Sequence, residues 1–153
     1  MSWLSDTDLV QKIQRNGNQL IKSSFHGVFP IDALPEFISN LPFTMVVNMD
    51  THNLPGSHWI AVYIDEHKRG EIFDSLALPT SLPLAKWMNQ FTVSWRKNSR
   101  YYQHLLSSHC GAFVIYFVLM RPHVTSIEDV TKTFTSSLYE NDSLVLIFFN
   151  CLK

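Results

Sequence analysis

Residues 110–120 constrain the fold of this chain more than any other segment, because every side of a helix built from them would be apolar. The segment Cys-Gly-Ala-Phe-Val-Ile-Tyr-Phe-Val-Leu-Met contains no charged residue, and Pro122 follows shortly after it. A helix that is hydrophobic all round must be covered by other parts of the protein, and proline cannot continue it. The sequence therefore predicts a buried helix over residues 110–120 that ends before Pro122.

Three segments before this helix have the pattern of strands. Residues 43–49 are rich in β-forming side chains, and residues 71–74 follow a hairpin connection at 66–70. Between them, residues 58–65 alternate along a strand, so that side chains lie on opposite faces in turn. One face would carry His58, Ile60, Val62 and Ile64, and the other would carry Trp59, Ala61, Tyr63 and Asp65. We expect these strands to form an antiparallel sheet.

The remaining segments predict several helices, so that the chain is expected to have an α+β fold. Helical spacing of apolar residues, with capping residues such as Ser5 and Ser126, predicts helices at about 6–15, 79–91, 126–133 and 143–152. Residues 91–95 and 101–102 are short strand candidates, residues 50–56 are expected to form a turn, and residues 25–30 are expected to form an ordered loop. No repeat or linker interrupts the chain. We therefore predict one domain over residues 1–153, with a central, mainly antiparallel sheet packed against the 110–120 helix.

Composition excludes several classes of protein. The chain has 153 residues, 46% of them hydrophobic, and a formal net charge of −1, so it is expected to fold and lacks the cationic excess of a dedicated nucleic-acid binder. Two distant cysteines do not form a secreted disulfide framework. The first residues do not form a secretion signal, and the apolar runs are too short to span a membrane. We expect an intracellular, monomeric protein that does not bind membranes.

Cys110 stands where the polar segment 107–109 meets the apolar helix. A helix N-terminus presents free N–H groups and a partial positive charge, and both favour the thiolate, the reactive form of cysteine. A lone cysteine before an apolar helix is most often a core residue. The functional interpretation therefore depends on whether a base, a group that orients this base and an oxyanion donor accompany the thiol.

The sequence offers one candidate for each of these roles. His58 begins the predicted central strand and could act as the base, and Asp74 ends the partner strand and could orient the imidazole. Gln103, seven positions before the cysteine, has an amide that could stabilise an oxyanion together with the backbone N–H of Cys110. Asp65 is the alternative orienting residue. Trp59 reads as a core residue that flanks the site and is also a candidate for contact with substrate.

The order and spacing of these residues resemble those of the adenovirus protease (adenain) and the related ubiquitin-like protein proteases. The resemblance spans about residues 27–118 and includes residues 46–50 and 55–62. It is carried chiefly by the pairs and runs His58-Trp59, Phe73-Asp74-Ser75-Leu76, Gln103 and Cys110-Gly111. Residues 25–35 are most similar to the adenain-like proteases of virophages and of large virus-like DNA transposons.

The resemblance implies an α+β fold, in which a sheet carries the base and the acid and a helix carries the cysteine. It implies peptide hydrolysis, commonly beside glycine, with Cys110 as nucleophile, His58 as general base and then acid, Asp74 as its orienting residue and Gln103 in the oxyanion hole. The implied partners are capsid precursor proteins, met in the infected cell (virus factory, cytoplasm or nucleus) or in the virion. The alternatives are an isopeptidase that removes a ubiquitin-like modifier and a catalytically inactive peptide-binding module.

We expect neither a metal nor another cofactor. His52, His58, His109 and Cys110 have no metal-ligand spacing. Adenain is activated by a disulfide-linked peptide and by DNA, but this chain has no cysteine between His58 and Cys110 and no cationic excess, so we expect neither mode. His109 reads as an exposed loop residue that could also tune the neighbouring thiol. Cys151 reads as a structural thiol on an apolar helix face.

Overall fold

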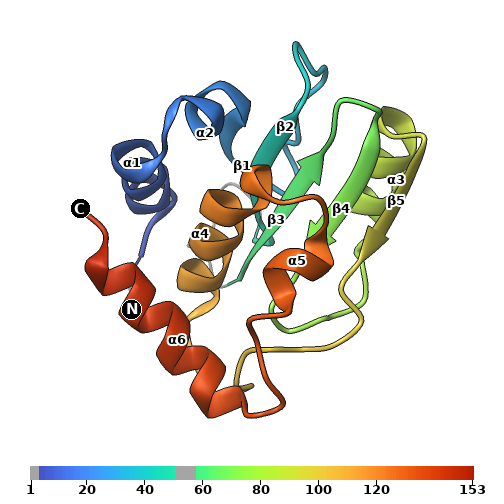
Figure 1. Ribbon diagram of the computed structural model, residues 1–153. Helices are drawn as coiled ribbons and strands as arrows, with labels where there is room; N and C mark the ends of the chain where they lie inside the picture. The colour runs from blue at the N-terminus through green and yellow to red at the C-terminus, as the bar shows by residue number, and fades with distance from the viewer. Residues whose placement is uncertain (1–3, 51–57) are drawn as a thin grey trace.

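A five-stranded sheet with helices on both faces forms the molecule (Figure 1). The structure is a computed structural model that describes residues 4–50 and 58–153. Its elements in chain order are α1 Asp6–Asn16, α2 Gln19–Ser24, β1 Phe25–Pro30, β2 Phe43–Asn48, β3 Trp59–Ile64, β4 Arg69–Phe73, α3 Leu82–Phe91, β5 Ser94–Lys97, α4 Cys110–Met120, the 3-10 turn η1 Arg121–His123, α5 Ile127–Thr131 and α6 Leu138–Cys151.

The sheet is antiparallel at its centre and parallel at both edges. Its strand order is β1-β2-β3-β4-β5, with β3 paired antiparallel to β2 and to β4. The edge strands β1 and β5 pair in parallel with β2 and β4. Parallel neighbours need a crossover connection, which residues 31–42 supply at one edge and α3 supplies at the other. The α+β class and the antiparallel centre are confirmed.

The alternation along β3 divides the interior into two cores. Trp59, Ala61 and Tyr63 pack on the face covered by α1, α4, α5 and α6. The other face carries the side chains Ile60, Val62 and Ile64, which pack with α3 and with the 31–41 segment. Helix α4 lies within the first core, and its residues 110–119 are all buried. The buried helix predicted over residues 110–120 is therefore confirmed.

The N-terminal region differs from the prediction in two places. Residues 25–30 were expected as a loop but form the edge strand β1, because their backbone pairs with β2 across a bulge that includes Gly27, with φ at +128°. The short helix α2 was not predicted. It has six residues, so hydrophobic periodicity cannot reveal it, and the side chain of Asn18 caps its first turn.

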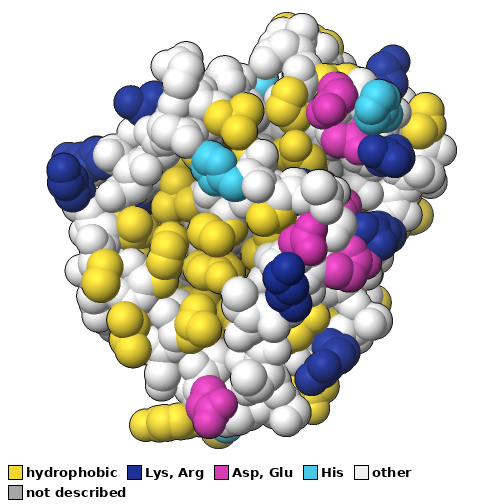
Figure 2. Space-filling view, in the orientation of Figure 1, with side chains coloured by type: hydrophobic (Ala, Val, Ile, Leu, Met, Phe, Trp, Pro, Cys, Tyr) yellow, Lys and Arg dark blue, Asp and Glu magenta, His cyan; other side chains and the backbone are white. Residues whose placement is uncertain are grey.

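The second half differs at its helix and strand ends. Helix α6 was expected from residue 143 but begins at Leu138, where the Ser137 side chain accepts a hydrogen bond from the Glu140 N–H. The strand candidate at 91–95 is found as β5 at 94–97, since Phe91 is the last residue of α3, and residues 101–102 do not form a strand. Hydrophobic side chains gather on the face over α4 and α6 (Figure 2). The second half of α6 is apolar on more than one side, and its Ile147 is 66% exposed.

Candidate active site

The ends of β3 and β4 bring a histidine and a carboxylate together. His58 immediately precedes β3, Asp74 immediately follows β4, and these strands are antiparallel neighbours, so the two residues meet at one end of the sheet. The distance between His58 Nε2 and Asp74 Oδ1 is 2.8 Å. Both side chains are largely buried, with 13% of His58 and 6% of Asp74 exposed. The structure therefore pairs the predicted base with the predicted orienting carboxylate.

Backbone and side-chain donors hold the Asp74 carboxylate in this orientation. Its Oδ1 also accepts a hydrogen bond from the Leu76 N–H, and its Oδ2 accepts one from the Leu78 N–H. The side chain of Asn98 accepts from the Asp74 N–H and donates to the Asp74 carbonyl, so it pairs with this backbone as a neighbouring strand would. Asp74 is consequently fixed before any substrate arrives, which is what an orienting residue requires.

Cys110 is the first residue of α4, and its thiol contacts the imidazole of His58. Its side chain is 3% exposed and forms a hydrogen bond with His58. Because Nε2 of His58 is engaged by Asp74, Nδ1 is the nitrogen left for the thiol. A Cβ at Gly111 would lie 2.9 Å from a Leu4 methyl carbon and 3.7 Å from the Trp59 ring, so glycine allows these side chains to cover the helix start.

The charges of the site are set by these contacts. Burial lowers the pKa of His58, but the hydrogen bonds and charges of Asp74 and Cys110 outweigh burial and raise this pKa to about 9. Burial raises the pKa of Asp74, whereas the hydrogen bond and the charge of His58 lower it, and the net shift is downward. At neutral pH His58 is therefore an imidazolium beside a carboxylate, ready to donate a proton.

Gln103 is buried on the loop before α4 with its amide fixed at both ends. Its Oε1 accepts a hydrogen bond of 2.6 Å from the Ser75 hydroxyl, and its Nε2 donates one of 2.9 Å to the Ser107 carbonyl. The backbone N–H groups of Tyr102 and Gln103 both donate to the Ser75 carbonyl. Since the amide has two N–H donors and Ser107 takes one, the other can serve an oxyanion.

The other sequence candidates lie elsewhere or play a different part. Asp65 binds the backbone and side chain of Arg69 in the β3–β4 turn, so it does not orient His58. Trp59 is a buried core residue, 4% exposed, whose indole N–H donates to Asp6. His109 is the N-cap residue of α4 and is half-buried rather than exposed. Cys151 was expected to be structural but is exposed near the end of α6. His52 lies outside the described residues.

Sequence reasoning assigned no role to the polar residues that hold the candidates in place, although Ser75 belongs to the segment that carries the family resemblance. Ser75 and Asn98 fix Gln103 and Asp74, and Asn141 with Asp142 on α6 contact the loop around Gln103. These partners are 24 to 39 positions apart in the chain, so no local periodicity reveals them. For Asn141 and Asp142, the one sequence feature that could have indicated a role is that these polar residues stand beside an apolar helical run.

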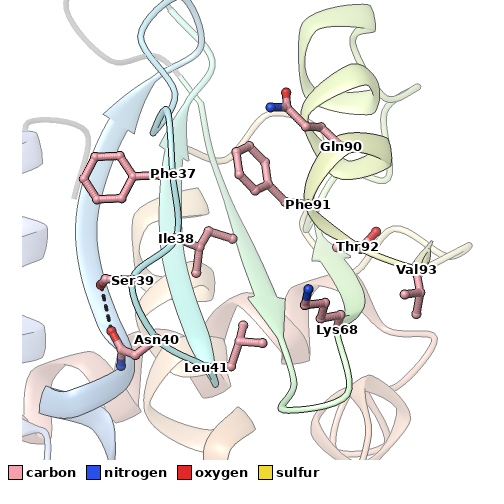
Figure 3. A pocket seen from close by; sticks show the side chains of 10 residues that line it. All are labelled: Phe37, Ile38, Ser39, Asn40, Leu41, Lys68, Gln90, Phe91, Thr92 and Val93. Atoms are coloured by element: carbon pink, nitrogen blue, oxygen red, sulfur yellow. Dashed lines mark hydrogen bonds between the residues drawn. The ribbon is translucent and has the colours of Figure 1, made fainter.

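Two hollows in the surface differ in their relation to this site. One of about 600 Å³ lies between residues 37–41 and the end of α3 (Figure 3), and its lining contains none of the four candidate residues. A smaller one, of about 150 Å³, is lined by His58 and Asp74 together with apolar side chains that include Ile60, Ile72 and Leu84. The second hollow therefore adjoins the His58–Asp74 pair, although neither Cys110 nor Gln103 lines it.

Within residues 4–50 and 58–153, no three His, Cys, Asp or Glu side chains are grouped so that they could hold a metal ion. In the same part of the chain, no helix has the length and apolar character needed to cross a membrane.

The His58–Asp74 pair predicts a change in pH dependence on substitution. We expect Asp74→Asn to remove the charge that sustains the imidazolium, and so to move the pKa of His58 from about 9 toward its ordinary value of 6.5. If His58 is the acid of a reaction, the pH at which kcat/KM declines on the alkaline side moves down by about one pH unit or more. Asp65→Asn is the matched control and should leave the limb in place.

The same pair makes a prediction about stability. Because the pKa of His58 is raised on folding, its contribution is complete below about pH 6.5 and is lost as the pH rises through 9. Urea unfolding should therefore show a difference between the wild type and Asp74→Asn that is larger at pH 6 than at pH 9.5. An equal difference at both values would contradict the assigned pKa of His58.

Comparison with known proteins places this geometry on a known fold. No protein-family model and no curated protein matches the sequence. Two structures of the ASFV pS273R protease align with TM-scores of 0.59 and 0.53, at 16% and 21% identity, over 81% and 67% of this chain. The central domain of the uncharacterized Lpg1148 protein from Legionella pneumophila aligns with a TM-score of 0.55, at 14% identity, over 96% of this chain and 94% of its own.

The chain has the fold of the ASFV pS273R protease. The α+β protease fold that the family resemblance implied is therefore confirmed. This chain spans 42% to 59% of the length of that protease, so the comparison covers only part of it.

Proposed function

We propose that this protein is a cysteine endopeptidase with Cys110 as its nucleophile. The observation that carries the proposal is the line of contacts from Asp74 through His58 to the thiol of Cys110 at the start of α4. The buried amide of Gln103 and the backbone N–H of Cys110 would supply the two oxyanion donors. The fold shared with the ASFV pS273R protease supports the same reaction class.

The first half of the reaction forms a thioester. The thiolate of Cys110 attacks the scissile carbonyl carbon, and the carbonyl oxygen becomes an oxyanion that the two N–H donors stabilise. The C–N bond then breaks, and the His58 imidazolium gives its proton to the departing amine. Asp74 keeps the ring oriented and stabilises its positive charge, as the 2.8 Å contact allows.

The second half releases the acid product. His58, now neutral, accepts a proton from water as this water attacks the thioester carbonyl. The C–S bond breaks and the thiolate of Cys110 is restored beside the imidazolium. No step in this cycle needs a metal or a cofactor.

As substrates we propose precursor proteins of a viral capsid, cut beside glycine. The sequence resemblance to adenain-like proteases supports this, and so does the shared fold with a protease of a virus, ASFV. The enzyme would then act inside the infected cell, in the virus factory, cytoplasm or nucleus, or within the assembling particle.

The test is to incubate the protein with candidate capsid precursors and with conjugates of ubiquitin-like modifiers, and to map the cuts by mass spectrometry. The proposal predicts cuts in the precursors that are absent with the Cys110→Ala variant. Cuts only in the conjugates would replace it with an isopeptidase. Cuts in neither, without labelling of Cys110 by a peptide aldehyde, would indicate a peptide-binding module.

The oxyanion role of Gln103 predicts a rate effect. We expect Gln103→Ala to lower kcat by roughly 100- to 1000-fold with little change in KM, because the donor acts on charge that develops in the transition state. The control is Gln90→Ala, which removes the same amide from a residue that lines the hollow of Figure 3. A kcat for Gln103→Ala within about threefold of the wild type would exclude the role.

A further inference from the structure

The loop that carries Gln103 is held from two sides. On the sheet side, the Ser75 carbonyl accepts the backbone N–H groups of Tyr102 and Gln103. On the helix side, Nδ2 of the buried Asn141 donates to the Tyr102 carbonyl at 3.2 Å. The same amide group donates to the Thr135 carbonyl, and its Oδ1 accepts from the Thr135 N–H, so Asn141 is itself rigidly placed.

Asp142 contacts the loop on the other side of Gln103. Its Oδ1 accepts a hydrogen bond of 3.2 Å from the His104 N–H. Its Oδ2 lies 3.4 Å from Nδ1 of His109, the residue directly before Cys110. This Nδ1 is buried and has no hydrogen-bond partner in the described part of the chain, so the Asp142 carboxylate lies close to it without forming a hydrogen bond.

We infer that Asn141 and Asp142, at the start of α6, are positioning residues of the oxyanion hole. They fix the backbone on both sides of Gln103, and Asp142 also faces the residue before the nucleophile. The two oxyanion donors, the Gln103 amide and the Cys110 N–H, therefore keep their separation through contacts with one helix. This inference rests on the proposed function and assigns α6 a part in it.

Asn141 and Asp142 are both buried, so each needs hydrogen-bond partners inside the protein. Asn141 is 1% exposed and Asp142 is 7% exposed, and the other buried residue of α6 is the apolar Val145. Burying polar groups is unfavourable unless they are hydrogen-bonded, and their partners here are the backbone of the catalytic loop. A loop that lost these contacts would place the Gln103 donor less accurately, and misplacement by about 1 Å can reduce a rate by roughly 100-fold.

The experiment compares two reactions of the same thiol. Hydrolysis of a peptide with a mapped cut site needs the oxyanion hole, whereas alkylation of Cys110 by iodoacetamide needs only the thiolate. We expect Asp142→Ala to lower kcat by about ten- to 100-fold while the alkylation rate stays within about twofold. Asp142→Asn retains an oxygen for the His104 N–H and should restore most of kcat. Tyr139→Ala, an exposed change on the same turn, is the control.

A double substitution tests the route of the effect. Adding Asp142→Ala to Gln103→Ala should reduce kcat by much less than it does in the wild type, because the donor that it positions is already gone. If Asp142→Ala does not fold, Asn141→Ser provides the same comparison from the Tyr102 side. An unchanged kcat, or equal losses of hydrolysis and alkylation, would overturn the inference. A wild type that hydrolyses no peptide would overturn the proposed function, and this role with it.

Discussion

Cys110→Ala should abolish hydrolysis and leave the fold intact. Loss of the nucleophile in a triad of this kind lowers the rate by about 10⁵-fold or more. The helix start would keep its packing, since alanine fills most of the same space and the hydrogen bond from the Phe113 N–H to the His109 carbonyl does not involve the side chain. The measurement is cleavage of a mapped substrate, with circular dichroism to confirm folding.

Cys151→Ala is the matched control for this substitution. Cys151 is the other cysteine of the chain and is exposed near the end of α6, far along the sequence from the candidate active site. The Cys151→Ala variant should retain the kcat and KM of the wild type. Residual cleavage by Cys110→Ala at more than a few per cent of the wild-type rate would contradict the assignment of the nucleophile.

Glu71→Ala should destabilise the protein by about 3–5 kcal/mol, because it leaves a buried cation unpaired. Glu71 on β4 and Arg121 after α4 form an ion pair in which 7% and 6% of the side chains are exposed. Glu71 also accepts the Ile127 N–H at the start of α5, and the guanidinium of Arg121 lies 4.1 Å from the centre of the Tyr63 ring. One carboxylate thus joins the sheet to the end of α4 and to α5.

Urea unfolding measures this effect, and two further variants locate its origin. Asp65→Ala breaks the pair with Arg69, whose side chain is 64% exposed, and should change the free energy of unfolding by only about 1 kcal/mol. Glu71→Leu combined with Arg121→Met removes both charges and should recover much of the loss. A loss of less than about 1 kcal/mol for Glu71→Ala would show that Arg121 is not held by this pair.

Patterns with a local physical cause were predictable from the sequence. The alternation over residues 58–65 reflects two buried faces, and the apolar run over 110–120 reflects a helix covered on every side. The candidates His58, Asp74, Gln103 and Cys110 came from their order along the chain. The fold brings His58 into contact with Asp74 and Cys110, and it holds Gln103 by a hydrogen bond to Ser75, the residue after Asp74. Their separation in sequence is bridged by the β3–β4 hairpin and the loop before α4.

The features that the sequence did not predict depend on contacts between residues that are distant along the chain. Residues 25–30 form a strand because their backbone pairs with the edge of β2, and nothing in the segment itself requires this pairing. The beginning of α6 was missed because polar Asn141 and Asp142 interrupt the apolar pattern, yet they are buried against the loop around Gln103. Asn98 looks like a loop residue in sequence, but its side chain binds the backbone of Asp74.

Competition between the two cysteines for one electrophile tests the central claim most directly. Cys151 is exposed and Cys110 is 3% exposed, so accessibility alone favours reaction at Cys151. A peptide aldehyde or chloromethyl ketone, quantified by mass spectrometry at each cysteine, reports which thiol is activated. The proposed site predicts that Cys110 reacts first and that His58→Ala removes this preference. Reaction at Cys151 with Cys110 unmodified would contradict it.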